Sequence, residues 1–367
     1  MSLPFSRSIA SVVETLLIGG IGGVVFGWLH IPAGWLIGSM VVVAAAALAG
    51  RTMVIPRRFT QVVFIAIGVS LGAVVTPETL RGMGTWPLSV AVMVIAIVFI
   101  SILSSGYLRY VHGWGTTASL LASAPGALSQ VMVMAGELGV DMRAVAVVQT
   151  VRVMVISIAL PLGLTMLGLV GADAPSVGGP FNPDLLGELA ILIGASAAAG
   201  VIFQRFNFPG GLLFGAMVCS GALHGSGLVH AVMPWWAVNA AMLALGCVTG
   251  ARFTNTSIRM FFNYLGAALG SLAVSVAIAA LFIVILVVGT ELQPADVSIA
   301  FAPGAVDVMM VLALALSLDP VYIGAHHLAR IVVISLAIPI VSHWSIRHER
   351  MPPEPEPPPV RKVPFDD

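Results

Sequence analysis

Long stretches without charged side chains limit the fold of this chain more than any other feature of its sequence. They are residues 15–50, 59–77, 82–108, 110–136, 153–172, 206–251 and 260–290. A membrane-spanning helix needs about 20 mostly apolar residues, so several stretches hold one span and the longest hold two. The stretches are glycine-rich and lack strand-like alternation, which favours helices over a β-barrel. The sequence therefore predicts an all-α, polytopic membrane protein.

The composition argues against several other classes of protein. Only 9% of the residues are charged, against roughly a quarter in an average soluble domain. The 16 basic and 16 acidic residues balance, so the chain has no overall field for binding nucleic acid. The two cysteines, Cys219 and Cys247, lie in apolar stretches, which argues against a disulfide framework or a cysteine zinc site. Neither a nucleotide-binding motif nor a histidine metal pair occurs in the sequence, so we expect no metal and no cofactor.

The chain contains an internal duplication, in which residues 124–161 match residues 302–339. The separation in sequence between matching positions is constant. The predicted organisation is a first membrane repeat at 8–170, a Gly/Pro-rich linker at 171–187, a second membrane repeat at 188–344, and a disordered, Pro-rich cytoplasmic tail at 345–367.

The fifth apolar segment of each repeat is interrupted by an Ala-Pro-Gly sequence. These turns contain Pro125 and Gly126 in the first copy, and Pro303 and Gly304 in the second. Proline and glycine together break a helix. We therefore expect each repeat to have about five spans plus one broken helix.

Basic residues in the loops indicate how the two repeats are oriented. Arg57 and Arg109 follow the second and fourth helices of the first repeat, whereas Arg205 and Arg252 follow the first and third helices of the second. Under the positive-inside rule the halves then run in opposite directions, with both termini on the cytoplasmic side of the inner membrane. The alternative is six full crossings in each of two parallel halves, which would leave the linker cytoplasmic without a basic residue. Inverted halves with broken helices are typical of secondary transporters.

Arg152 and Arg330 occupy equivalent positions in the two repeats. Each follows, at the same spacing, an aspartate that we expect to cap the sixth helix of its repeat, Asp141 or Asp319. This spacing corresponds to about 16 Å of helix, which is about half the depth of the hydrocarbon core. The pair could bind an anionic substrate group at the midplane, or could hold the carbonyl groups of the broken helices as a scaffold.

Polar residues just after the Ala-Pro-Gly turns are further candidates for substrate or ion binding. Ser129 and Gln130 follow the first turn, and Asp307 follows the second. The start of a helix presents free N–H groups, and in transporters such ends bind substrate carboxylates or coupling ions. Asp307 is the candidate for coupling to a proton or cation. The alternative is that it caps the half-helix or pairs with Arg152 or Arg330.

Gln149 and His327 are equivalent positions, each shortly before one of the two arginines. His327, or its neighbour His326, could relay a proton or bind substrate. The alternative is a buried, hydrogen-bonded histidine that serves the core.

The duplicated block resembles the AbrB family, bacterial membrane proteins with an internally duplicated membrane domain that are also labelled ammonia monooxygenase. The matching sequences are SAPGALSQVMVMAGELGVDMRAVAVVQTVRV and FAPGAVDVMMVLALALSLDPVYIGAHHLARIVV, together with HIPAGWLIGSM and NFPGGLLFGAM. The resemblance covers nearly the whole chain except its tail. The family label implies regulation of gene expression, and the older name implies ammonia oxidation. The predicted architecture is similar to that of the cation–proton antiporter and bile-acid symporter group.

The expected function is ion-gradient-driven secondary transport of small anionic or zwitterionic metabolites. The alternative, implied by the family label, is a membrane-bound regulator of gene expression that uses the bundle as a sensor or scaffold. We expect no enzyme, because the sequence lacks a clustered metal site for a monooxygenase, and no direct binding of nucleic acid. The expected partners are the lipid bilayer, a small-molecule substrate and a proton or cation. A homo-oligomer is left open.

Overall fold

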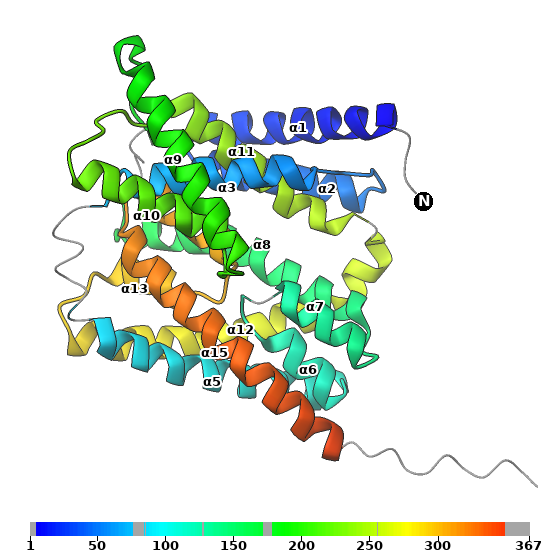
Figure 1. The fold of residues 1–367 in the computed structure, drawn as a ribbon. Coiled ribbons are helices and arrows are strands. Elements are labelled where there is room, and N and C mark those ends of the chain that lie inside the picture. Colours follow the sequence, from blue (N-terminus) through cyan, green and yellow to red (C-terminus); the bar gives the residue numbers. More distant parts are fainter. Residues whose placement is uncertain are drawn as a thin grey trace, which may run out of the picture.

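The computed structural model describes residues 5–75, 84, 86–126, 128–171, 178–254 and 256–348 (Figure 1). The regular elements of this part of the chain are helices. The α-helices are α1 (Phe5–Trp28), α2 (Gly34–Leu48), α3 (Arg57–Gly72), α5 (Trp86–His112), α6 (Thr116–Ser123), α7 (Leu128–Glu137), α8 (Met142–Met166), α9 (Leu186–Arg205), α10 (Gly211–Gly225), α11 (Trp235–Gly250), α12 (Ile258–Gly289), α13 (Pro294–Phe301), α14 (Val306–Ala315) and α15 (Pro320–His348). Two 3-10 helices, η2 (Pro183–Leu185) and η3 (Ala251–Phe253), adjoin α9 and α11.

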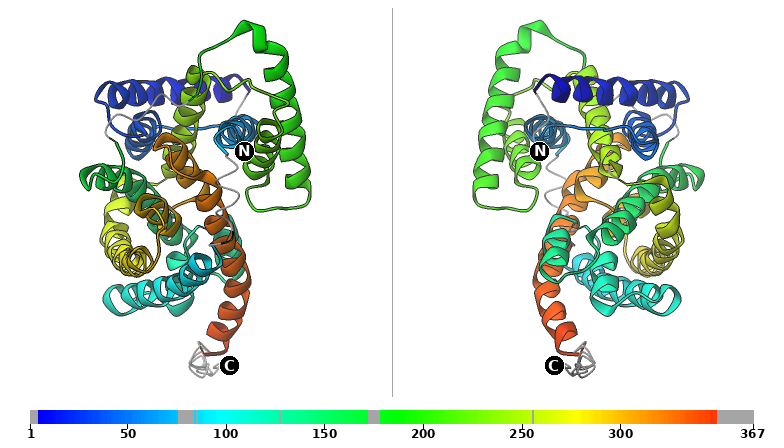
Figure 2. Two further views of the ribbon diagram at one scale, coloured as in Figure 1. Left: turned by 90° about the vertical axis from the view of Figure 1, so that its left-hand side faces the viewer. Right: turned by 90° about the vertical axis from the view of Figure 1, so that its right-hand side faces the viewer.

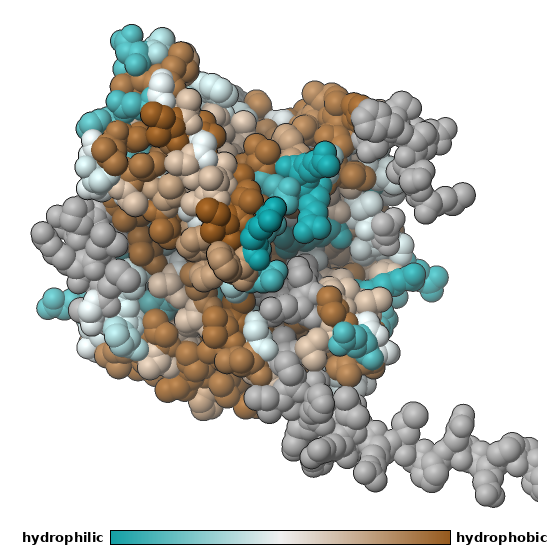
Figure 3. All heavy atoms as spheres, viewed as in Figure 1, coloured by the Kyte–Doolittle hydropathy of each residue, from teal (hydrophilic) through white to brown (hydrophobic). Residues whose placement is uncertain are grey.

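Seven helices of the described part are long and apolar enough to cross a membrane: α1, α5, α8, α9, α11, α12 and α15. Their outward faces carry large apolar side chains, such as Leu17 on α1 and Leu281 on α12, which are 65% and 58% exposed. Most of the face in Figure 3 is accordingly hydrophobic, and hydrophilic residues gather in a few patches. Lipid chains solvate such a surface better than water does. These features confirm the prediction of an all-α, multi-pass membrane protein.

The helices pack in two groups, one above the other in Figures 1 and 2. Group I consists of α1, α2, α3, α9, α10 and α11, and group II consists of α5 to α8 and α12 to α15. In group I, α2 packs on α1 and α11, and α3 packs on α10. In group II, α12 packs on α5 and α8, and α15 packs on α5, α13 and α14. The groups meet where α14 contacts α3 and where α8 contacts α2 and α11.

Glycines allow the helices of group I to approach closely. A Cβ atom on Gly22 of α1 would lie 2.2 Å from the carbonyl oxygen of Gly38 on α2, and a Cβ on Gly38 would lie 2.1 Å from the oxygen of Gly22. Such a distance excludes any larger side chain at either position. Small residues at helix crossings are the usual means of close packing in membranes, where helices gain little from hiding apolar surface.

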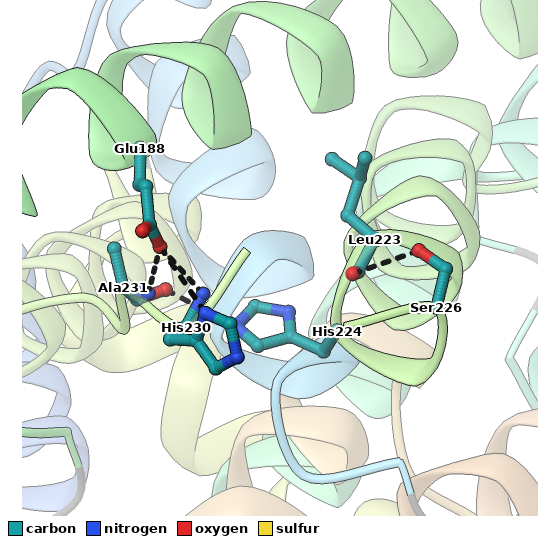
Figure 4. A network of polar contacts seen from close by, with 6 residues as sticks. All are labelled: Glu188, Leu223, His224, Ser226, His230 and Ala231. Atoms are coloured by element: carbon teal, nitrogen blue, oxygen red, sulfur yellow. Dashed lines mark hydrogen bonds and ion pairs between the residues drawn. The ribbon is translucent and has the colours of Figure 1, made fainter. Parts of the chain in front are cut away.

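A polar network holds the loop between α10 and α11 at one end of group I (Figure 4). The carboxylate of Glu188, on α9, accepts hydrogen bonds from the N–H groups of His230 and Ala231 at 2.6 and 3.1 Å. The ring nitrogens of His224 lie 2.8 and 3.1 Å from the carbonyl oxygens of Ser220 and Ala231. The network therefore joins α9, α10 and the loop.

The ends of the predicted repeats differ slightly from the helix boundaries. α15 continues to His348, past the expected end of the second repeat at residue 344. The remainder of the predicted tail, residues 349–367, lies outside the described residues. In the predicted linker the described part contains an isolated bridge between Gly179 and Pro234, and Asn182 caps η2.

Candidate functional site

Two helices of group II are broken at equivalent places. α6 ends at Ser123 and α7 begins at Leu128, and α13 ends at Phe301 and α14 begins at Val306. Pro125 and Pro303 lie in these gaps. A proline has no N–H group to continue a helix, and its ring clashes with the preceding turn. The carbonyl groups that end α6 and α13 therefore need donors from elsewhere in the protein.

Arg152 supplies the donors for the first break. Its guanidinium donates to the carbonyl oxygens of Ala122, Ser123 and Ala124 at 3.3, 3.1 and 2.9 Å. The residue is only 3% exposed, so these bonds lie in the interior of the protein. Three C-terminal carbonyl groups of a helix also provide the partial negative charge that a buried cation requires.

Arg330 has the same function at the second break. It donates to the carbonyl oxygens of Ala302 and Gly304 at 2.6 and 3.0 Å, and it contacts Nδ1 of His327. The two breaks are also adjacent, because a Cβ atom on Gly126 would lie 3.3 Å from Nε of Arg330. Arg330 thus holds its own break and lies against the other.

Gln149 and His327 make equivalent bonds one turn away from the arginines. Nε2 of Gln149 donates to the carbonyl oxygen of Leu121 at 2.9 Å, and Nε2 of His327 lies 3.2 Å from that of Ile299. His327 donates from Nε2 and accepts from Arg330 at Nδ1, so the neutral imidazole satisfies both contacts. His327 is therefore held as part of the scaffold, in the manner of a glutamine.

The two aspartates cap α8 and α15, as expected from the sequence. Asp141 accepts hydrogen bonds from the N–H groups of Arg143 and Ala144 at the start of α8. Asp319 accepts from Val321 and Tyr322 at the start of α15. Burial raises the pKa of the Asp319 carboxyl above its ordinary value.

Gly126, in the first break, tolerates substitution poorly. Its φ is +85°, where an ordinary L-residue is strained by roughly 1–2 kcal/mol. An added Cβ would also press on the Arg330 guanidinium. We expect Gly126→Ala to lower the Tm of the purified protein. In the control Gly163→Ala, on α8, the added Cβ has no atom within 4 Å, so the Tm should stay constant or rise. Equal Tm values for both variants would contradict the strain at this break.

A cavity of about 450 Å³ lies between the broken helices and group I. Its polar lining includes Arg152 on α8, Arg252 in η3 and Asp307 on α14. Its apolar lining includes Phe64 on α3 and Phe214 on α10. The cavity thus combines side chains of both groups of helices, with a volume typical of sites for small molecules.

Asp307 forms an ion pair with Arg252, with 3.4 Å between Oδ2 and Nη2. The side chains are 16% and 25% exposed, so the pair is shielded from bulk water without being fully buried. Asp307 lies in the first turn of α14, whose N-cap residue is Ala305, and its side chain makes no capping bond there. The partner of Asp307 is therefore neither of the buried arginines named as alternatives in the sequence analysis.

The comparisons with known proteins cover nearly all of the chain. The model of a family described as "Transition state regulatory protein AbrB" matches residues 35–345. The chain belongs to the AbrB family. It is similar to "Putative regulator AbrB" of Escherichia coli (strain K12), with 24% identity over 316 residues, which are 86% of this chain and 90% of that protein. It is also similar to "Uncharacterized protein YhjN" of Bacillus subtilis (strain 168), with 24% identity over 349 residues, 88% of this chain and 90% of that protein.

In this AbrB-family chain, the cavity is lined by only some of the residues that the sequence singled out. Gly126, Gln149, Arg152 and Asp307 line it. Five other predicted residues do not line it and lie in the breaks or next to them: Pro125, Pro303, Gly304, His327 and Arg330. Ser129 and Gln130 lie in the first turn of α7, and their side chains are outside the described part of the structure. Among the described residues, no group of three His, Cys, Asp or Glu side chains could hold a metal ion.

Arg252 is the functional candidate of this AbrB-family chain that sequence reasoning missed. At the offset of the duplication its counterpart is Val74, so the repeat contains no signal for it. Its place next to a loop indicated only the orientation of the repeat. The ion pair with Asp307 joins residues 55 positions apart, which no local pattern predicts.

Proposed function

We propose that this AbrB-family protein is a secondary transporter that moves small anionic or zwitterionic metabolites across the inner membrane through the cavity. The observation that carries the proposal is the position of the cavity between the two groups of helices. Arg152 and Asp307 of group II and Phe64 and Phe214 of group I line it together. A shift of one group against the other would change which side of the membrane the cavity opens to.

The charges of the cavity suit an anionic substrate group. Arg152 and Arg252 provide two guanidinium groups, and one carboxylate, Asp307, opposes them. The first N–H groups of α14 add partial positive charge at the same place. For a zwitterion, Asp307 would receive the ammonium group. For an anion, it would take up the coupling proton or cation.

The proposed mechanism includes two inverted halves, which exchange conformations to open the site to each side in turn. The constant offset of the duplication and the alternating positions of the basic loops support this arrangement. Both termini then lie in the cytoplasm. The sequence contains no nucleotide-binding motif, which favours an ion gradient as the driving force.

The second candidate function is regulation of gene expression by a membrane-bound sensor. The description of the family and the name of the Escherichia coli relative favour it. A sensor would use the cavity to bind a metabolite and would not need to open it to both sides. An enzyme stands third, and a metal that stays with the purified protein would favour it.

An experiment that distinguishes a transporter from a sensor measures from which face of the membrane one cavity residue can be reached. In a chain without Cys219 and Cys247, we would introduce Ala305→Cys, which changes a cavity-lining residue and keeps Arg152 and Asp307. A membrane-impermeant thiol reagent is then applied to each face of sealed vesicles separately. We expect labelling from both faces, because a transporter exposes its site to each side in turn.

The control is Leu281→Cys in the same background. Leu281 is a 58% exposed residue on the apolar outer face of α12, so a water-soluble reagent should label it from neither face. If Ala305→Cys is labelled from a single face under all conditions, transport is refuted and the sensor is favoured.

A further inference from the structure

The cavity has an apolar part and a polar part. Apart from Arg252 in η3, which adjoins α11, the part formed by group I is apolar, with Phe64 on α3 and Leu213 and Phe214 on α10. Val153 and Ile331 extend this apolar lining onto group II. Such walls lose favourable contacts when water or a fully polar molecule lies against them, and gain when an apolar group covers them.

Arg152, which lines the polar part of the cavity, also has a buried donor without an acceptor in the described part of the protein. The terminal nitrogens of Arg152 bond to the carbonyl groups that end α6, but its Nε–H has no partner within the described residues. Arg152 is 3% exposed, and a buried N–H group without an acceptor is rare in proteins. The Nε–H of Arg330, which does not line the cavity, is unpaired in the same way within this part of the chain, so what Arg152 offers to a ligand in the cavity is the positive charge of its guanidinium.

The start of α14 offers further donors to the same ligand group. The first bond within α14 runs from the N–H of Met309 to the carbonyl oxygen of Ala305. The N–H groups of Val306 and Asp307, which also line the cavity, precede this bond and have no acceptor in the helix. Arg252, which pairs with the carboxylate of Asp307, lines the same cavity and adds a second guanidinium group.

We infer that the substrate is an amphipathic carboxylate, in which one carboxylate is attached to a compact apolar body such as a ring or a branched chain. The inference rests on the proposed transport function and narrows its substrate class. The carboxylate lies against Arg152 and the start of α14, and the apolar body lies against Phe64 and Phe214. The volume of about 450 Å³ lies within the range of roughly 300–1,000 Å³ that is typical of sites for small molecules.

Three probes test the inference on the purified full-length protein, with binding measured by titration calorimetry. 3-Phenylpropionate has both parts, 3-phenylpropan-1-ol lacks the charge, and succinate lacks the apolar body. We expect 3-phenylpropionate to bind about tenfold or more tightly than either of the others, because each lacks one of the two contacts. Phe64→Ala should weaken its binding by about tenfold, since the ring of Phe64 covers the apolar body.

The matched control is Phe262→Ala, which removes a ring that is 62% exposed on α12 and does not line the cavity. It should leave the affinity for 3-phenylpropionate unchanged. Succinate binding as tightly as 3-phenylpropionate, or no binding of any probe, would overturn the inference. This comparison needs only the unmodified protein, so it stands even if Phe64→Ala fails to fold.

The binding experiment and the labelling experiment can fail independently of each other. Selective binding of 3-phenylpropionate together with labelling of Ala305→Cys from one face retains the ligand class and refutes transport. Labelling from both faces without this selectivity retains transport and refutes the amphipathic carboxylate.

Discussion

Replacing Arg330 with methionine is expected to reduce the yield of folded protein about tenfold or more, because two buried acceptors lose their donor. These are the carbonyl oxygen of Gly304 and Nδ1 of His327, whereas the carbonyl oxygen of Ala302 keeps a bond from the N–H of Gly304. A buried acceptor without a partner costs about 1–3 kcal/mol, so the loss is on the order of 4 kcal/mol. Removal of a buried charge offsets part of this cost. The remainder is still a large part of a total stability of about 5–15 kcal/mol.

Size-exclusion chromatography and thermal unfolding in detergent would measure the effect. Arg259→Met is the matched control, because Arg259 is an exposed residue in the first turn of α12. Its yield and Tm should stay close to those of the unchanged protein. Arg330→Lys keeps the charge without the planar fork of donors, so its yield and Tm should lie between those of Arg330→Met and Arg259→Met. Native yield and Tm in Arg330→Met would show that the guanidinium does not hold the second break.

Asp307→Asn is expected to change the affinity for anions and zwitterions in opposite directions. The substitution removes the carboxylate that opposes Arg252 and leaves two guanidinium groups in the cavity without a counter-charge. An anion should then bind about tenfold or more tightly, because a repulsive charge has gone. A zwitterion should bind about tenfold less tightly, because its ammonium group loses its partner.

3-Phenylpropionate and phenylalanine form a suitable pair of ligands, since they differ only in the ammonium group. Calorimetric titration of both, against the unchanged protein and Asp307→Asn, gives the sign of each effect. Asp184→Asn is the control, because it makes the same chemical change at an exposed residue of η2, away from the cavity. If Asp307→Asn changes neither affinity, the ion pair does not belong to the binding site. Folding is expected to persist, because Asp307 makes no capping bond to α14.

The sequence predicted those parts of the fold that depend on local chemistry. The charge-free stretches became long apolar helices such as α5 and α12, because a helix in lipid must satisfy its own backbone and expose apolar side chains. The two breaks occur at Pro125 and Pro303, because a proline cannot donate to the preceding turn. The caps at Asp141 and Asp319 also follow from side chains that bond to N–H groups two or three residues away.

The role of the buried arginines was left open by the sequence and became defined only by contacts in space. The spacing indicated that Arg152 and Arg330 lie deep in the protein, but both a scaffold and an anion site were compatible with that depth. The structure shows that each guanidinium holds the end of a broken helix. Arg152 also lines the cavity, whereas Arg330 does not. The two equivalent arginines therefore share the role of holding a helix end, but only Arg152 also forms part of the cavity wall.

By itself, then, the sequence determined the helical class, the positions of the breaks and caps, and the duplicated chemistry around them. Only the tertiary structure decided that α3 and α10 line one cavity together with residues of the breaks, and that Asp307 pairs with Arg252. The physical reason is the range of the interactions. Helix formation, breaking and capping act over a few residues, whereas the cavity depends on how separate helices pack, and many packings satisfy the same apolar surfaces.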